Sequence, residues 1–102
     1  MPFERVCSLA DLPNNSVFEA IVRDDPYAIC NVNGRITALY GVCPHAGGPL
    51  GQGQIAPSGR LICPYHMWEF DCVTGQSAFV PSIVVPTYPV KVEADDVLAD
   101  LP

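Results

Sequence analysis

Proline and glycine interrupt the chain so often that no segment keeps a helical hydrophobic periodicity over about ten residues. The 102 residues include 11 prolines and 8 glycines, spread along the whole length. Between them lie short runs of alternating or β-branched and aromatic residues. The one expected helical turn covers Ser8–Leu12. The sequence therefore predicts an all-β fold of stacked antiparallel sheets built from many short strands.

A tight hairpin is the strongest local signal in the sequence. Tyr27–Val32 and Arg35–Tyr40 flank Asn33-Gly34, a dipeptide that favours a two-residue turn because both positions tolerate positive φ. The other expected strands are Ser16–Arg23, Leu61–Cys63, Trp68–Cys72, Tyr88–Glu93 and Val97–Leu101. We expect the last two to form a hairpin around Asp95-Asp96.

Within the expected strand Ser16–Arg23, alternate residues differ in character. Phe18, Ala20 and Val22 are all apolar, whereas the residues between them include Glu19. Because successive side chains of a strand point to opposite faces, we expect the apolar set to face the core.

Length and composition limit what the chain can do by itself. It is 49% hydrophobic and 16% charged, as globular domains are. A chain of 102 residues supports one hydrophobic core, so we expect a single domain over residues 1–102 and no separate nucleotide-binding domain. No apolar run approaches the roughly 18 residues of a membrane-spanning helix, and the N-terminus lacks a signal-peptide pattern. These features predict a cytoplasmic protein that does not associate with membranes.

The charge balance is acidic, with 11 Asp and Glu against 5 Lys and Arg, a net of −6. Nucleic acid is not an expected partner, because phosphate contacts need clustered basic side chains and the chain has none. Acidic residues gather near the C-terminus, from Glu93 to Asp100. A solvated hairpin accounts for them, and a docking face for a basic partner is the alternative.

Two segments, Cys43-Pro44-His45 and Cys63-Pro64-Tyr65-His66, each supply one cysteine and one histidine. Thiols stay reduced in the cytoplasm, so an odd total of five cysteines favours metal binding over a disulfide framework. If the cysteines hold one metal and the histidines another, the asymmetric donor set suits a [2Fe–2S] cluster with two histidines on one iron. A single zinc ion held by all four is the alternative, although the spacing differs from common zinc motifs.

The same segments resemble the signature of the Rieske iron–sulfur family. The resemblance continues through Pro49-Leu50, Trp68–Asp71, Thr74-Gly75, Pro81 and Tyr88–Val92, and so covers essentially the whole chain. It implies a Rieske-type fold in which a cluster-binding subdomain of two loops, about residues 41–85, is inserted in a β base. It also implies one [2Fe–2S] cluster at the tip, bound by Cys43 and Cys63 on one iron and by His45 and His66 on the other.

The length favours one branch of this family. It leaves no room for the second, mononuclear iron domain of a terminal oxygenase, and both histidines are already assigned to the cluster. The chain is similar to freestanding ferredoxins of ring-hydroxylating oxygenase systems. That implies a monomeric electron carrier, not an enzyme. It would take electrons from an NAD(P)H-dependent flavoprotein reductase and pass them to a terminal aromatic-ring oxygenase, both docking at the His45/His66 tip. The small subunit of an assimilatory nitrite reductase and the ferredoxin of a diiron monooxygenase remain alternatives.

Four other positions bear on the redox chemistry that the resemblance implies. Respiratory members join their two loops by a disulfide at the positions of Gly48 and Tyr65, so no such bridge forms here. They also carry hydroxyl donors to cluster sulfur where this chain has Trp68 and Phe70. Without these donors we expect a potential near the low end of the Rieske range, which begins at about −150 mV. The remaining cysteines, at positions 7, 30 and 72, are expected to be small buried core residues.

Overall fold

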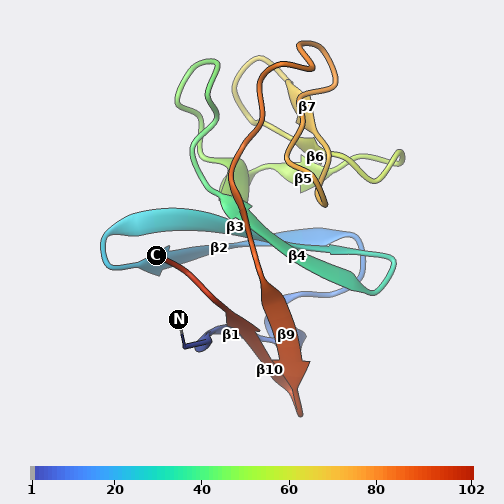
Figure 1. Cartoon of the computed structure of the whole chain (residues 1–102). Coiled ribbons are helices and arrows are strands. Elements are labelled where there is room, and N and C mark those ends of the chain that lie inside the picture. The colour runs from blue at the N-terminus through green and yellow to red at the C-terminus, as the bar shows by residue number, and fades with distance from the viewer. Residues whose placement is uncertain (1) are drawn as a thin grey trace.

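The computed structural model describes residues 2–102 as three antiparallel sheets stacked one above another (Figure 1). The lower sheet comprises β1 (Glu4–Ser8), β10 (Asp96–Ala99) and β9 (Val90–Glu93). The middle sheet comprises β2 (Ser16–Val22), β3 (Asp25–Val32), β4 (Arg35–Tyr40) and β8 (Thr87–Tyr88). The upper sheet comprises β5 (Gln54–Ile55), β6 (Leu61–Ile62) and β7 (Glu69–Phe70). The predicted all-β fold is confirmed.

Helical structure in the described residues is limited to two 3-10 turns of three residues each, η1 (Leu9–Asp11) and η2 (Leu50–Gln52). The first lies within the predicted helical turn, and Ser8 and Asp11 form a capping box at its start. Within residues 2–102 we find no helix with the length and apolar character needed to cross a bilayer.

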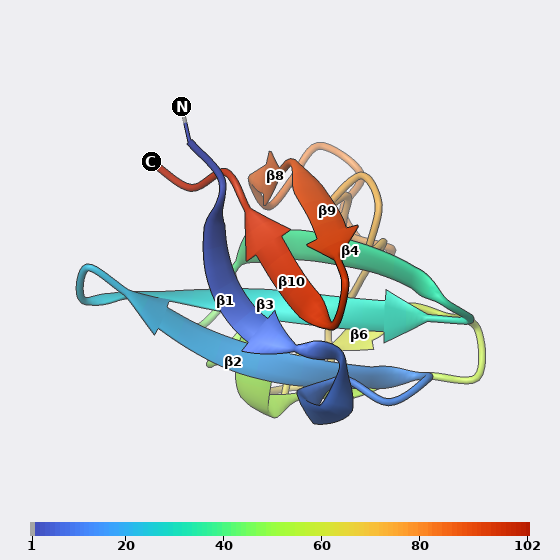
Figure 2. The same ribbon diagram turned by 90° about the horizontal axis from the view of Figure 1, so that it is seen from below.

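Strand β3 is buried on both faces and serves two hydrophobic cores. Ala28 and Cys30 belong to an upper core beneath the small upper sheet, whereas Tyr27 and Ile29 belong to a lower core shared with the lower sheet. Figure 2 shows the lower sheet crossing β2 and β3 on the side away from the upper sheet. The middle sheet is therefore the common platform of the molecule.

The predicted face of β2 is confirmed. Phe18, Ala20 and Val22 all pack in the lower core, and Val17, on the opposite face, packs against the upper core. Sequence alternation identified one buried face, but it did not show that the second face is also partly covered, because the covering segment comes from far along the chain.

The predicted hairpin between β3 and β4 is also confirmed. Asn33 and Gly34 have φ values of 53° and 90°, and the register pairs Val32 with Arg35 around them. The Asn31 side chain accepts a hydrogen bond from the Gly34 N–H at 2.9 Å, and its amide donates to the Leu12 carbonyl at 2.9 Å. One buried amide thus supports the turn and ties it to the segment after η1.

The C-terminal strands differ from the prediction of one continuous run over residues 88–93. The chain changes sheets at Pro89, because Thr87–Tyr88 pairs with β4 whereas Val90–Glu93 pairs with β10. Proline has no N–H to donate to a ladder, so it suits a junction between two strands. The final turn is centred on Ala94, at φ 53°, and Asp95, and Asp96 is already paired with Glu93.

Strands β4 and β8 are neighbours in the middle sheet, and the segment between them rises from that sheet. This segment, residues 41–86, holds the upper sheet and the loops at the upper end of Figure 1. All four predicted ligand residues belong to it.

Replacing Ile29 with alanine should lower the free energy of unfolding by about 2–5 kcal/mol, because it opens a cavity in the lower core where this side chain is fully buried. The matched control is Ile21→Ala on the adjacent strand. Because Ile21 is 63% exposed, this change should lower the free energy of unfolding by less than about 0.5 kcal/mol. Urea unfolding followed by far-UV circular dichroism measures both. Equal losses in the two variants would contradict the assignment of the lower core.

Candidate metal centre

Two loops of the same construction carry the four predicted ligands. In the first, the Cys43 N–H donates to the Gly48 carbonyl at 2.9 Å, and in the second the Cys63 N–H donates to the Trp68 carbonyl at 2.7 Å. Each bond spans five residues, so each cysteine lies at the base of its loop and is buried, while His45 and His66 lie at the exposed turns. The spacing of each Cys–His pair therefore separates a buried thiol from an exposed imidazole.

The second loop turns through an unusual backbone. His66 and Met67 have φ values of 60° and 59°, so two successive residues with side chains occupy the left-handed region. For L-residues this region costs roughly 1–2 kcal/mol each, and such strain is found where a side chain must be held in a particular place. Here it reverses the chain sharply and presents His66 at the end of the loop.

The donors are grouped as two pairs. Burial raises the pKa of the Cys63 thiol to about 11, and the adjacent Cys43 thiol contributes to this rise. The Tyr65 N–H donates a hydrogen bond to the Cys63 Sγ at 3.4 Å, which acts to lower the pKa. The two imidazoles lie edge to face with ring centroids 5.0 Å apart. In residues 2–102 no three His, Cys, Asp or Glu side chains converge closely enough to hold one metal ion. A buried sulfur pair and an exposed nitrogen pair fit a binuclear group with unlike ends.

An aromatic stack orients one of the imidazoles. The His45 ring lies on the Trp68 indole with centroids 4.2 Å apart and an interplanar angle of 9°. Trp68 is the only tryptophan, and its other neighbours include Phe79, at 6.3 Å and 82°. This stack was not predicted from the sequence, because nothing in the residue pattern shows that the first loop folds over the second.

Contact between the two loops depends on Gly48. A Cβ at this position would lie 2.7 Å from the Cys63 Sγ and 2.9 Å from Cγ of Tyr65, so any side chain would displace one of them. The Tyr65 ring thus packs against the backbone of the first loop. Gly48 and Tyr65, the positions at which respiratory members carry a disulfide, do face each other here. Contact between the Tyr65 ring and the backbone of Gly48 joins the two loops in place of a disulfide.

The other three cysteines lie in the cores, as predicted. Cys7 packs in the lower core, where burial raises its pKa to about 11. Cys30 and Cys72 adjoin each other in the upper core, and that contact raises the pKa of Cys30. The Cys72 thiol donates to the Gly59 carbonyl at 3.4 Å. All three behave as small buried side chains.

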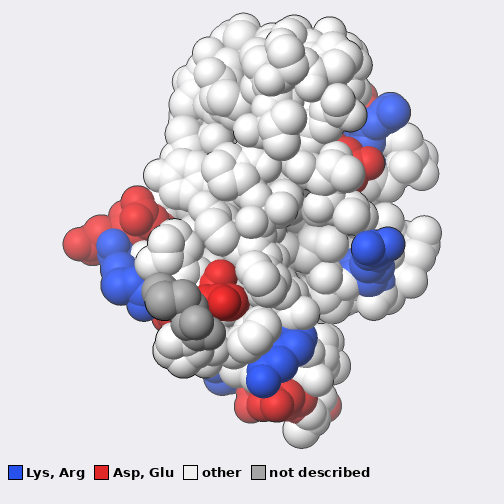
Figure 3. Space-filling model, viewed as in Figure 1, with Lys and Arg blue, Asp and Glu red and all other residues white. Residues whose placement is uncertain are grey.

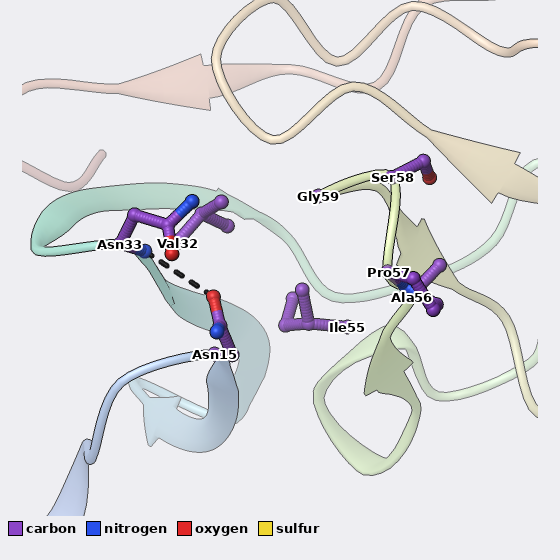
Figure 4. A pocket seen from close by; sticks show the side chains of 8 residues that line it. All are labelled: Asn15, Val32, Asn33, Ile55, Ala56, Pro57, Ser58 and Gly59. Atoms are coloured by element: carbon purple, nitrogen blue, oxygen red, sulfur yellow. Dashed lines mark hydrogen bonds between the residues drawn. The ribbon is translucent and has the colours of Figure 1, made fainter.

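A cavity of about 330 Å³ lies away from the predicted ligands (Figure 4). Its walls come from Asn15, from the turn after β3 and from residues 55–59. At one side of the cavity the Asn33 N–H donates a hydrogen bond to the Asn15 side chain at 3.3 Å. None of the four candidate ligands lines it. The exposed imidazoles, rather than a cavity, are the accessible part of the candidate centre.

Replacing Trp68 with alanine should shorten the half-life of bound iron by about 2–12-fold, the equivalent of about 0.5–1.5 kcal/mol for an aromatic pair. The change removes the ring that orients His45, whereas Trp68→Phe keeps an aromatic face. The control is Phe79→Ala, which removes an exposed neighbour of Trp68. Iron release to a chelator, followed by absorbance, measures the rate. Equal rates in the wild type and Trp68→Ala would refute an orienting role for the stack.

Replacing Gly48 with alanine should reduce iron bound per chain after reconstitution, because the new methyl group must displace the Cys63 sulfur. Gly47→Ala is the matched control: Gly47 has φ 73° and open space around its Cβ, so only a backbone strain of about 1–2 kcal/mol is added. Iron and protein assays give the ratio. Lower iron content in Gly47→Ala than in Gly48→Ala would contradict the steric argument.

Comparison with known proteins shows the family to which the chain belongs. A family model for the Rieske [2Fe-2S] domain matches residues 3–89. The ferredoxin component of biphenyl 2,3-dioxygenase from Rhodococcus jostii is 32% identical over 102 residues, covering 99% of this chain and 94% of the relative. The ferredoxin component of the alkene monooxygenase system of Xanthobacter autotrophicus is 31% identical over 93 residues, covering 91% of this chain and 76% of the relative.

A solved structure gives the same result for the fold. The ferredoxin of Sphingomonas yanoikuyae B1 superposes with a TM-score of 0.86 and 28% identity, covering 99% of this chain and all of the other. This confirms the predicted Rieske-type fold. Because the family model spans most of the sequence and the relatives align along nearly all of it, the chain belongs to the family of Rieske [2Fe–2S] domain proteins.

Proposed function

We propose that the chain is the ferredoxin component of a ring-hydroxylating oxygenase system, carrying single electrons on one Rieske [2Fe–2S] cluster. The observation that carries this proposal is the arrangement of the exposed end. The His45 and His66 rings lie together at the surface, 5.0 Å apart, above two buried thiols. A group held there has one protected side and one side within reach of another protein, as one-electron exchange between proteins requires.

We assign Cys43 and Cys63 to one iron and His45 and His66 to the other. The thiols are buried and adjacent, and the imidazoles are exposed and adjacent, so the donors fit the two unlike irons of such a cluster. When bound, the cluster supplies reversible one-electron exchange. The chain binds it, keeps water from the thiolates and holds the imidazoles at the surface. A single zinc ion would need all four donors to converge on one point, whereas they are grouped in two pairs.

The role of a carrier rather than a catalyst is supported by the relatives. Both the biphenyl dioxygenase and the alkene monooxygenase relatives are ferredoxin components, and they align with this chain over nearly its whole length. Chemistry on a substrate then belongs to other proteins of the system, and this chain docks with them. We infer that a flavoprotein reductase and a terminal oxygenase both bind at the His45/His66 end.

The reduction potential expected for the cluster is low, which fits the same role. Trp68 and Phe70 occupy the positions from which hydroxyl groups would stabilise the reduced cluster, and neither carries one. The NAD(P)H-fed reductase proposed as donor suits an acceptor at the low end of the Rieske range. We infer that the protein works in the cytoplasm, where thiols such as its five cysteines stay reduced, and that it is a monomer that meets its partners transiently.

The alkene monooxygenase relative supports a second candidate, the ferredoxin of a monooxygenase system, at 31% identity. Both candidates share the cluster and the carrier role and differ in the oxygenase that receives the electron. The third possibility, a nitrite reductase small subunit, predicts permanent association with a large subunit. Isolation of this chain as a monomer would count against that possibility.

Film voltammetry of the purified protein should give a reversible one-electron wave near the low end of the Rieske range, at about −150 mV. Cys43→Ser should abolish the wave, because it removes a proposed ligand. Cys7→Ser, a change of the same kind in the lower core, should retain it. A high potential would favour a quinol-linked role, and a folded, metal-loaded protein without any wave would leave the zinc interpretation.

A further inference from the structure

Charged side chains are distributed unevenly between the two ends of the molecule. Between positions 36 and 90 only Arg60, Glu69 and Asp71 are charged, although the chain has 5 basic and 11 acidic residues in total. In the view of Figure 3, the upper end of the molecule shows no charged side chains, and the charged side chains lie along its side and over its lower part. Nearly all of the net charge of −6 therefore belongs to the lower and middle sheets and their turns.

Two of the three charges of the upper segment pair with each other, and the third accepts hydrogen bonds from the backbone. Arg60 Nη1 lies 3.8 Å from Glu69 Oε1. The Asp71 carboxylate accepts hydrogen bonds from the N–H groups of Thr74 at 2.9 Å and Val73 at 2.7 Å, which lower its pKa. Of the net charge of −6, the upper segment therefore carries only −1.

The exposed imidazoles are surrounded by uncharged, largely apolar side chains. Tyr65 and Met67, which flank His66, are 51% and 54% exposed, and Phe79, which contacts Trp68 beside His45, is 59% exposed. We call the surface formed by His45, Tyr65, His66, Met67 and Phe79 the neutral end. Exposed apolar groups gathered around a functional site indicate a surface that other proteins cover.

We propose that the neutral end docks on a redox protein whose own docking face is uncharged and apolar, so that apolar burial rather than charge steering brings the two together. The inference rests on the proposed function and adds the chemistry of the partner. At physiological salt the Debye length is about 8 Å, so charges beneath the upper core are largely screened from a partner at this end. A charged docking face would lose its hydration there without gaining an opposite charge.

A second copy of the chain is a defined probe, because its neutral end is a face of the proposed kind. Electron self-exchange between oxidised and reduced copies can be measured from NMR line broadening in mixtures of the two. For the wild type we expect the rate to change less than about threefold between roughly 0.05 and 0.5 M salt. Met67→Glu and Met67→Lys should both slow exchange several-fold at low salt, because each places like charges face to face. High salt should restore both rates.

The controls are Ile21→Glu and Ile21→Lys, which change the net charge equally at a position on β2 that is 63% exposed. Their rates should stay within about twofold of the wild type at every salt concentration. Phe79→Glu and Phe79→Lys repeat the charge test on a different loop, in case a Met67 variant distorts the second one. Electron paramagnetic resonance of each reduced variant checks that the cluster is intact.

Acceleration by Met67→Lys with slowing by Met67→Glu would overturn the inference, because it would show that the negative charge of the whole molecule governs approach. A wild-type rate that rises more than about tenfold with salt, or no self-exchange despite a reversible voltammetric wave, would overturn it too. A stable dimer in sedimentation velocity, or binding to neutral phosphatidylcholine vesicles, would assign the neutral end to another occupant. Failure to obtain any redox-active cluster would instead refute the proposed function.

Discussion

The packing of two thiols into the upper core is the constraint on which the rest of this structure depends. Cys43 and Cys63 belong to the same buried cluster as Leu39, Leu61 and Phe70, so the candidate centre and the core are one unit. The upper sheet has strands of only two residues each, which bury little by themselves. A metal group bound to both cysteines would therefore link the two loops beside this small sheet, and its binding free energy would contribute to folding.

The platform below this unit explains why the loops can be strained and exposed. Strand β3 is buried on both faces, and β4 and β8 hold the two ends of the upper segment side by side. With its ends held in this way, the segment can accommodate two left-handed residues at His66 and Met67 and still place the histidine at the surface. The lower core contributes stability at a distance from the centre, so the loops are free to serve exchange with a partner.

Sequence reasoning predicted the features that are local in the chain. The all-β class followed from proline and glycine spacing, the hairpin from Asn33-Gly34, and the four candidate ligands from two short segments. Features that depend on contact between distant segments were not predicted. The stack of His45 on Trp68 needs one loop folded over the other, and the sheet change at Pro89 needs β4 and β10 as competing partners. The scarcity of charged residues between positions 36 and 90 is visible in the sequence, but only the fold shows that most of these residues lie at one end of the molecule.

The separation of charge from the exposed imidazoles reconciles two demands on an electron carrier. Net charge keeps a small protein soluble, yet charge beside the docking surface would bind one partner strongly and repel another. Under the proposed function, placing the charge on the lower and middle sheets leaves the neutral end able to meet two different proteins in turn. A contact that buries only a few apolar side chains is weak, and because most differences in affinity lie in the dissociation rate, such a contact breaks quickly. A carrier that must leave one partner before it reaches the next gains more from rapid release than from tight binding.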